Sequence, residues 1–259
     1  MSLSDLLDPI TASGGSARFD NLDNWLQGRT LYGGASALIA YTAAIRAFPD
    51  LPPLRAAQIA FVAPTGPDVE LRREIIRQGR NVAQVRSEIW CEGSCTLSAF
   101  LLFGTGREPN ALHAAAPVAD WPGPPEDADN AMNGKGPAFI QNNFEIRRAQ
   151  DARGPGDPVV RRWARLTDRS GLDAISELIL LGDVLPPGAM RAMKRQGPIS
   201  SINWSFNLLD TAPTTRDGWW LSENASQHAD DGYSSERLRL WNADGQQVLD
   251  GMQSVAVFG

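Results

Sequence analysis

Apolar positions follow two different periods along this chain. Residues 31–48 (LYGGASALIAYTAAIRAF) are apolar almost throughout and contain no proline, which predicts a long buried helix. Residues 172–182 (LDAISELILLG) predict a second helix, and Pro186 and Pro187 follow it as stop signals. Gly33 at the start of the first helix indicates that this helix lies close against another surface.

Most of the remaining chain alternates apolar and polar positions, with turns about every ten residues, which is typical of antiparallel strands. Strands are predicted at 55–64, 68–77, 81–92 and 95–103, and then at 138–149, 160–167, 200–209, 219–228, 233–242 and 247–258. Residues 104–136 are rich in Pro, Gly, Ala and Asp and predict a linker with little regular structure.

The order of strand, helix and four strands recurs in both halves of the chain. Three anchors align: 53–61 (PLRAAQIAF) with 198–206 (PISSINWSF), Ile89-Trp90 with Leu240-Trp241, and Phe103-Gly104 with Phe258-Gly259. A curved antiparallel sheet covers a long apolar helix, and two such units joined edge to edge leave fewer exposed edges. The predicted fold is α+β, with two antiparallel sheets that each wrap a helix and join into one continuous sheet. We predict an N-terminal unit at 1–106, a linker at 107–136 and a C-terminal unit at 137–259.

Composition narrows the possible functions. The net charge of −6 and the pI of about 5.0 argue against a general nucleic-acid binder. The first residues lack the basic and apolar regions of a signal peptide, and no apolar run approaches the length of a membrane span. Cys91 and Cys95 flank a turn-like Glu92-Gly93-Ser94 and are expected to be reduced thiols rather than a disulfide or a metal pair. We therefore expect a cytoplasmic protein without a membrane partner.

Short motifs in the two halves carry a family resemblance. They are Leu31-Tyr-Gly-Gly34, Pro53-Leu54, Phe61-Val-Ala-Pro64, Arg77-Gln-Gly79-Arg80 and Val82-Ala83, followed by Gly182-Asp183, Pro186-Pro187, residues 201–206 (SINWSF), Asp244-Gly245 and Met252-Gln253. In number and order these motifs resemble the TesB-like acyl-CoA thioesterases, which have a double hotdog fold. The resemblance implies an acyl-CoA substrate, hydrolysis by an activated water, no cofactor and no metal. It also implies a homo-oligomer, a dimer or larger, that acts in fatty acid metabolism.

The same resemblance implies three catalytic residues in the second half, Asp183, Ser201 and Gln253. Asp183 would act as the general base toward water, while Ser201 and Gln253 would orient that water by hydrogen bonds. The family more usually has Thr where this chain has Ser201, and a register error of one residue would place Ser200 there instead. The repeat aligns Ala56 and Ser98 with Ser201 and Gln253, so the second half is expected to carry the chemistry.

Three other functions remain open from the sequence. Gly34-Ala-Ser36-Ala-Leu38 resembles a serine-hydrolase elbow that lacks its second glycine and its parallel strand. A hotdog hydratase or dehydratase would need a histidine near a helix, but the chain has only His113 and His228, outside both helices. A non-catalytic acyl-CoA or acyl-ligand binding protein is the third alternative.

Arginines that could meet the phosphates of coenzyme A are numerous on the predicted strands. For each one a solvated strand face is the more ordinary reading, and none is assigned to the ligand. They are Arg72, Arg73, Arg77, Arg80, Arg86, Arg147, Arg148, Arg161, Arg162 and Arg165.

Overall fold

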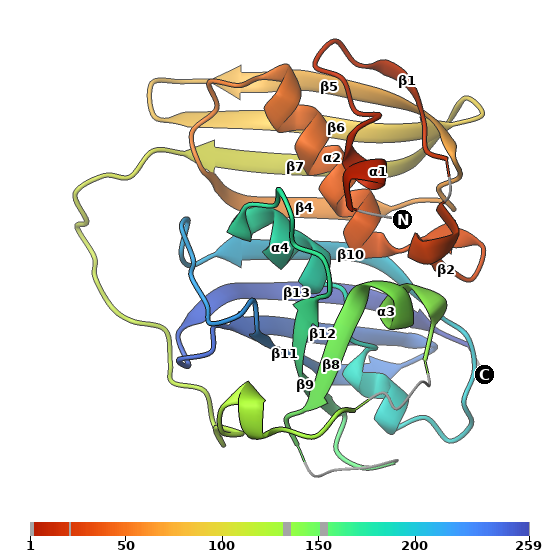
Figure 1. Ribbon diagram of the computed structural model, residues 1–259, viewed down its shortest axis with the longest axis vertical. Helices are drawn as coiled ribbons and strands as arrows, with labels where there is room; N and C mark the ends of the chain where they lie inside the picture. The colour runs from red at the N-terminus through yellow and green to blue at the C-terminus, as the bar shows by residue number, and fades with distance from the viewer. Residues whose placement is uncertain (1–2, 21, 132–135, 151–154, 259) are drawn as a thin grey trace.

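A single antiparallel sheet of eleven strands runs through the molecule (Figure 1). The computed structural model describes residues 3–20, 22–131, 136–150 and 155–258. The strand order is β1-β5-β6-β7-β4-β10-β13-β12-β11-β9-β8, so the first half of the chain forms one side of the sheet and the second half forms the other. The predicted continuous double hotdog sheet is confirmed.

The first half builds its part of the sheet around one long helix, α2. Its elements are α1 (Leu3–Leu7), β1 (Gly15–Arg18), the 3-10 turn η1 (Leu22–Trp25), β2 (Leu26–Gln27), β3 (Thr30–Leu31), α2 (Gly33–Ala47), β4 (Leu54–Phe61), β5 (Asp68–Gln78), β6 (Val82–Cys91) and β7 (Ser94–Gly104). The short strands β2 and β3 pair with each other outside the large sheet and lead directly into α2.

The second half repeats this plan with a shorter helix. Its elements are η2 (Pro125–Asp127), α3 (Ala138–Asn143), β8 (Phe144–Arg148), β9 (Val159–Leu166), α4 (Ala174–Leu181), η3 (Gly188–Arg191), β10 (Ile199–Leu208), β11 (Trp220–Asp230), β12 (Tyr233–Trp241) and β13 (Gln247–Val257). Asp173 caps the start of α4, since its side chain accepts a hydrogen bond from the Ser176 N–H.

The core lies between the two helices and the inner face of the curved sheet. Residues 34–44 of α2 and 175–181 of α4 are all buried, and one apolar cluster unites both halves. The two helices contact each other, and Figure 1 shows them on the same side of the sheet. Because neither half buries its helix alone, the two repeats share one core.

The two halves join where β4 pairs with β10. The register places Trp204 opposite Ile59 and Phe206 opposite Ala57. This pairing occupies the edge that each half would otherwise expose, which removes two templates for unwanted strand addition.

The pairing register corrects the sequence alignment of the repeats. Each half has a bulge at the equivalent place, between Leu54 and Ala56 in β4 and between Ser201 and Asn203 in β10. Matching these bulges and the strand pairs beside them makes Leu54 the first-half equivalent of Ser201, and Leu101 that of Gln253. The sequence alignment had given Ala56 and Ser98 instead. The alignment of letters missed this because residue identities do not record the pairing register of the strands. Both first-half positions are buried and apolar, so the polar pair has no counterpart there.

Two other expectations change in detail. The strand predicted at 138–149 begins as helix α3 and becomes strand β8 only at Phe144. Asn143 explains the switch, because its side-chain amide donates to the carbonyls of Phe139 and Asn24 and closes the helical turn. In the predicted linker, Trp121 packs edge-on against Trp163 with ring centroids 5.4 Å apart. No helix within the described residues is both long enough and apolar enough to span a bilayer.

Candidate active site

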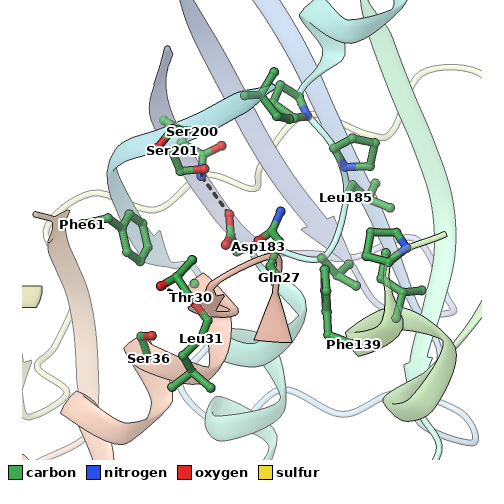
Figure 2. A pocket seen from close by; sticks show the side chains of 18 of the residues that line it. Gln27, Thr30, Leu31, Ser36, Phe61, Phe139, Asp183, Leu185, Ser200 and Ser201 are labelled. Atoms are coloured by element: carbon green, nitrogen blue, oxygen red, sulfur yellow. Dashed lines mark hydrogen bonds between the residues drawn. The ribbon is translucent and has the colours of Figure 1, made fainter. Parts of the chain in front are cut away.

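Three polar side chains from separate elements meet at one end of α2. Asp183 follows α4, Ser201 lies near the start of β10, and Gln253 lies within β13. The Gln253 Nε2 donates to Asp183 Oδ1 at 2.8 Å and to Ser201 Oγ at 2.9 Å. Figure 2 shows Asp183 and Ser201 close to each other in the pocket. The structure therefore brings together all three of the residues that the sequence suggested.

The bulge in β10 decides which serine faces this site. Ile202 is the extra residue of the bulge, so both Ser201 and the buried Trp204 face the inner side of the sheet although they are three residues apart. Ser200 is exposed and also lines the cavity, but it makes no hydrogen bond to Gln253. Ser201, and not its neighbour, is the hydroxyl beside the carboxylate.

The carboxylate of Asp183 lies against the first turn of α2. It accepts a hydrogen bond from the Gly34 N–H, and a Cβ atom added to Gly33 would stand 2.3 Å from Asp183 Oδ2. Gly34 is equally confined, since its Cβ would stand 2.6 Å from the Leu180 carbonyl oxygen. The glycine pair thus permits the first half of the chain to approach the Asp183 carboxylate of the second half.

Tyr32 fixes this approach. Its hydroxyl donates to the Leu180 carbonyl at 2.5 Å, which satisfies one of the free carbonyls in the last turn of α4. Its ring stacks on Phe139 at 4.3 Å and is fully buried. A contact between the start of α2 and the end of α4 therefore holds Gly34 and Asp183 in place.

Burial dominates the electrostatics of Asp183. It raises the pKa of this carboxyl from an ordinary 3.8 to about 7, while the hydrogen bonds from Gln253 and Gly34 oppose the rise. The residue keeps partial contact with the cavity, so the group is deep but reachable. A carboxyl with a pKa near neutrality can accept and return a proton at physiological pH.

A cavity of about 660 Å³ opens beside these groups. Its walls come from both halves of the chain and are mainly apolar. They include Leu31, Phe61, Val62, Phe139, Ile140, Ile146, Val160, Val184, Leu185 and Met190, with Thr65, Thr96 and Ser36 as buried polar members. Asp183, Ser201 and Gln253 all line the same cavity.

A buried glutamate fixes residues 185–189, part of which lines the cavity. Glu236 accepts hydrogen bonds from the N–H groups of Gly188 and Ala189, and Asn224 donates to the Leu185 carbonyl. These bonds fix the segment that follows Asp183, so the cavity is formed before a ligand arrives.

Sequence reasoning missed the contribution of the first half. Gly33 was interpreted as a packing residue, and no role was given to Tyr32 or Phe61. The only available signal was the Tyr-Gly-Gly motif at a helix start, since the contact with Asp183 joins residues about 150 positions apart. Within the described residues, no three His, Cys, Asp or Glu side chains lie close enough together to hold a metal ion.

The fold and the site together define a double hotdog protein with a carboxylate, a hydroxyl and an amide at one cavity. Family models agree with this class: the acyl-CoA thioesterase N-terminal domain matches residues 22–104, and the acyl-CoA thioesterase C-terminal domain matches residues 111–257. The chain belongs to the acyl-CoA thioesterase family.

Solved structures share the fold over nearly the whole chain. A candidate thioesterase II from Thermobifida fusca is 20% identical with a TM-score of 0.83, and covers 100% of this chain and 98% of its own. A hot dog protein from Alicyclobacillus acidocaldarius is 20% identical with a TM-score of 0.82, over 94% and 92% of the two chains. The acyl-CoA thioesterase II TesB2 from Mycobacterium marinum is 19% identical with a TM-score of 0.75, over 99% and 98%. Among curated protein sequences no match was found.

Proposed function

We propose that this protein hydrolyses the thioester of an acyl-CoA to a free acid and coenzyme A, with Asp183 as the general base. The observation that carries the proposal is the arrangement of this carboxyl. It has a pKa of about 7, it faces an apolar cavity, and it shares the Gln253 amide with Ser201. The family supports the same reaction. The proposal also includes a homo-oligomer that acts in fatty acid metabolism, which rests on the family alone. The cytoplasmic location rests on the sequence composition.

In the first step, the ionised Asp183 accepts a proton from water while the water oxygen attacks the thioester carbonyl. Gln253 orients the side chains of Asp183 and Ser201, because its Nε2 donates a hydrogen bond to each of them. Ser201 Oγ accepts that bond, which leaves its own proton available to the water or to the substrate oxygen. The tetrahedral intermediate then expels the thiolate, and protonated Asp183 returns its proton to the thiolate sulfur.

The start of α2 is suited to the developing negative oxygen. Its cap residue Tyr32 provides no side-chain hydrogen bond to the helix, so the first N–H groups are not satisfied by a cap. Gly33 lines the cavity beside Asp183. A helix N-terminus carries partial positive charge, which would stabilise the oxyanion there.

The alternatives lack equivalent support. Ser36 lies inside α2 rather than at a turn after a strand, and the strand pairs of the large sheet are antiparallel. His113 and His228 are both exposed, and neither is among the described residues that line the cavity. Ser36 lines the cavity but lacks the elbow of a serine hydrolase, and hydration through a histidine would need a site elsewhere.

Thiol release from a panel of acyl-CoAs tests the proposal, with two adjacent serines as a matched pair. Ser201→Ala should lower kcat/KM by about 10²-fold, because it removes one hydrogen-bonding group at the reacting centre. Ser200→Ala should leave it within about twofold, since Ser200 lies outside the hydrogen-bond set. Equal losses in both variants would refute the assignment. Tight binding of acyl-CoA without any thiol release would instead identify a non-catalytic acyl-binding protein.

A further inference from the structure

The strands β8 and β9 each place an arginine on the inner face of the sheet, which faces the core rather than solvent. Along β9, Val160 and Ala164 are buried in the main core, and Arg162 lies between them on the same face. Along β8, the buried Phe144 and Ile146 share a face with Arg148. Arg162 itself lines the large cavity, whereas the sequence suggested a solvated strand face.

These two arginines are direct neighbours. The register of the strands sets Arg148 opposite Arg162, and like charges in that position destabilise a sheet. Arg191, on η3, adds a third positive charge nearby. Burial lowers the pKa of Arg162, and the charges of Arg148 and Arg191 lower it further. Three cations therefore lie near one another, and one of them, Arg162, lines the cavity.

Other arginines of the same strands are paired with acids. Arg161 bonds to the buried Glu223, and Arg165 bonds to Glu145 at 2.9 Å. Among the described residues, Arg162 donates to two neutral groups, the Gln150 side chain at 3.1 Å and the Arg161 carbonyl at 2.6 Å. Among the carboxylates that the structure describes, none forms an ion pair with Arg162 or Arg148. A positive charge kept in a cavity without an acid is suited to an anion that arrives with the ligand.

The cavity connects this charge to the reaction site. Asp183 and Arg162 both line it, together with the apolar Ile146, Val160 and Met190. Gln253 is on β13, and β9 lies three strands away in the order β13-β12-β11-β9, which is ~14 Å along the sheet. The charge is therefore too far away to act on the thioester itself, but a single extended ligand could reach both ends.

We infer that Arg162, with Arg148 beside it, forms an anion subsite that binds an acidic group of the substrate remote from the thioester. This inference rests on the proposed thioester hydrolysis. Two sources provide the same chemistry: a phosphate of the coenzyme A moiety, or a second carboxylate at the far end of the acyl chain. The planar guanidinium of arginine can donate two parallel hydrogen bonds to either group.

Calorimetric binding distinguishes the two sources without needing catalysis. Two pairs of probes are used: coenzyme A against pantetheine, and a medium-chain dicarboxylic acid against the monocarboxylic acid of equal length. Wild type should bind the more acidic member of one pair more tightly. Arg162→Gln should weaken binding of that member by roughly 10- to 100-fold and leave binding of its less acidic counterpart unchanged, and Arg148→Gln should do so to a smaller extent. Arg165→Gln, on the same strand but the opposite face, is the matched control and should change neither pair.

The outcomes separate this inference from the proposed function. A loss confined to coenzyme A identifies the phosphate as the anion, and a loss confined to the dicarboxylate identifies the acyl end. If Arg162→Gln binds every probe as wild type does, the subsite is refuted, even where thiol release is normal. If thiol release is absent but the anion preference depends on Arg162, the hydrolase proposal fails and the subsite stands.

The midpoint of thermal unfolding distinguishes a ligand-binding role of Arg162 from a purely structural role. Because Arg162 faces Arg148 at close range, Arg162→Gln should keep or raise the midpoint of thermal unfolding. A clear fall in that midpoint, together with unchanged ligand binding, would show that Arg162 serves the fold instead.

Discussion

Replacing Asp183 by Asn should make the protein more stable at high pH while it removes activity. The substitution keeps the size of the side chain, and its amide oxygen can still accept the Gly34 N–H. It removes the titration and the charge, and it replaces one accepting oxygen by a donating NH2 group. Stability and catalysis should therefore move in opposite directions, which a general packing defect cannot produce.

The magnitude follows from the raised pKa. The folded pKa is about 7 against an ordinary 3.8, a difference of about 3 units, or about 4 kcal/mol of total linkage. Since the folded pKa is the higher one, the unfolded chain ionises first as pH rises. Wild type loses stability from about pH 4 until about pH 7, and above that no further loss occurs. The loss amounts to about 3 kcal/mol between pH 5 and pH 8.

Urea unfolding at several pH values measures this loss. The free energy of unfolding of Asp183→Asn minus that of wild type should rise by about 3 kcal/mol from pH 5 to pH 8. Asp50→Asn, on an exposed turn, is the control and should show a flat difference. Parallel curves for Asp183→Asn and wild type across this range would refute the burial argument.

Activity should report the same group. The kcat/KM of wild type should rise with pH and level off above about pH 7, because the ionised carboxylate is the base. Asp183→Asn should lower kcat/KM by about 10²- to 10⁴-fold and lose this pH dependence. Full activity in the variant would exclude Asp183 as the base, whatever its effect on stability.

Two further predictions concern the contact between the halves. Gly33→Ala should lower kcat/KM by at least about 10-fold, because its Cβ would stand 2.3 Å from Asp183 Oδ2. Gly66→Ala is the control and should be neutral, since its Cβ would meet nothing within 4 Å. Steady-state kinetics that find both variants neutral would contradict the contact. Tyr32→Phe should lower the free energy of unfolding by about 1–3 kcal/mol in urea, since the buried Leu180 carbonyl loses its donor. An unchanged midpoint would mean that this bond does not hold the two helices together.

The fold was largely predictable because it rests on local patterns. Period-two alternation identifies the long strands, and the apolar run at 31–48 identifies α2. The failures occur where a tertiary contact overrides the pattern. Residues 138–143 read as strand, but Pro137 precedes the turn and Asn143 closes it through bonds to its own helix and to Asn24. Strand bulges also left no mark in the letters, so the repeat was aligned two or three residues out of register.

The site was predictable only in part. Asp183, Ser201 and Gln253 were expected from a family resemblance, and the structure places them in one hydrogen-bonded set. The surroundings that give Asp183 its pKa could not be read from the sequence. They depend on burial and on Gly34, which lies far from Asp183 along the chain. Likewise, Arg162 could be assigned to the inner face only once the alternation of β9 was known.

The duplication explains why the site needs both halves. A carboxylate after the last turn of α4 faces the negative end of that helix, which is unfavourable for the ionised form. The positive end of α2 lies against the same carboxylate and offsets this effect through the Gly34 N–H. The second half supplies the three polar side chains of the proposed site, and the first half supplies the helix start that favours the ionised form of Asp183. At the positions of Ser201 and Gln253, the first half has buried Leu54 and Leu101, so it cannot build the reciprocal site. The first half therefore supports the site of the second half, and separating the two halves should abolish this site.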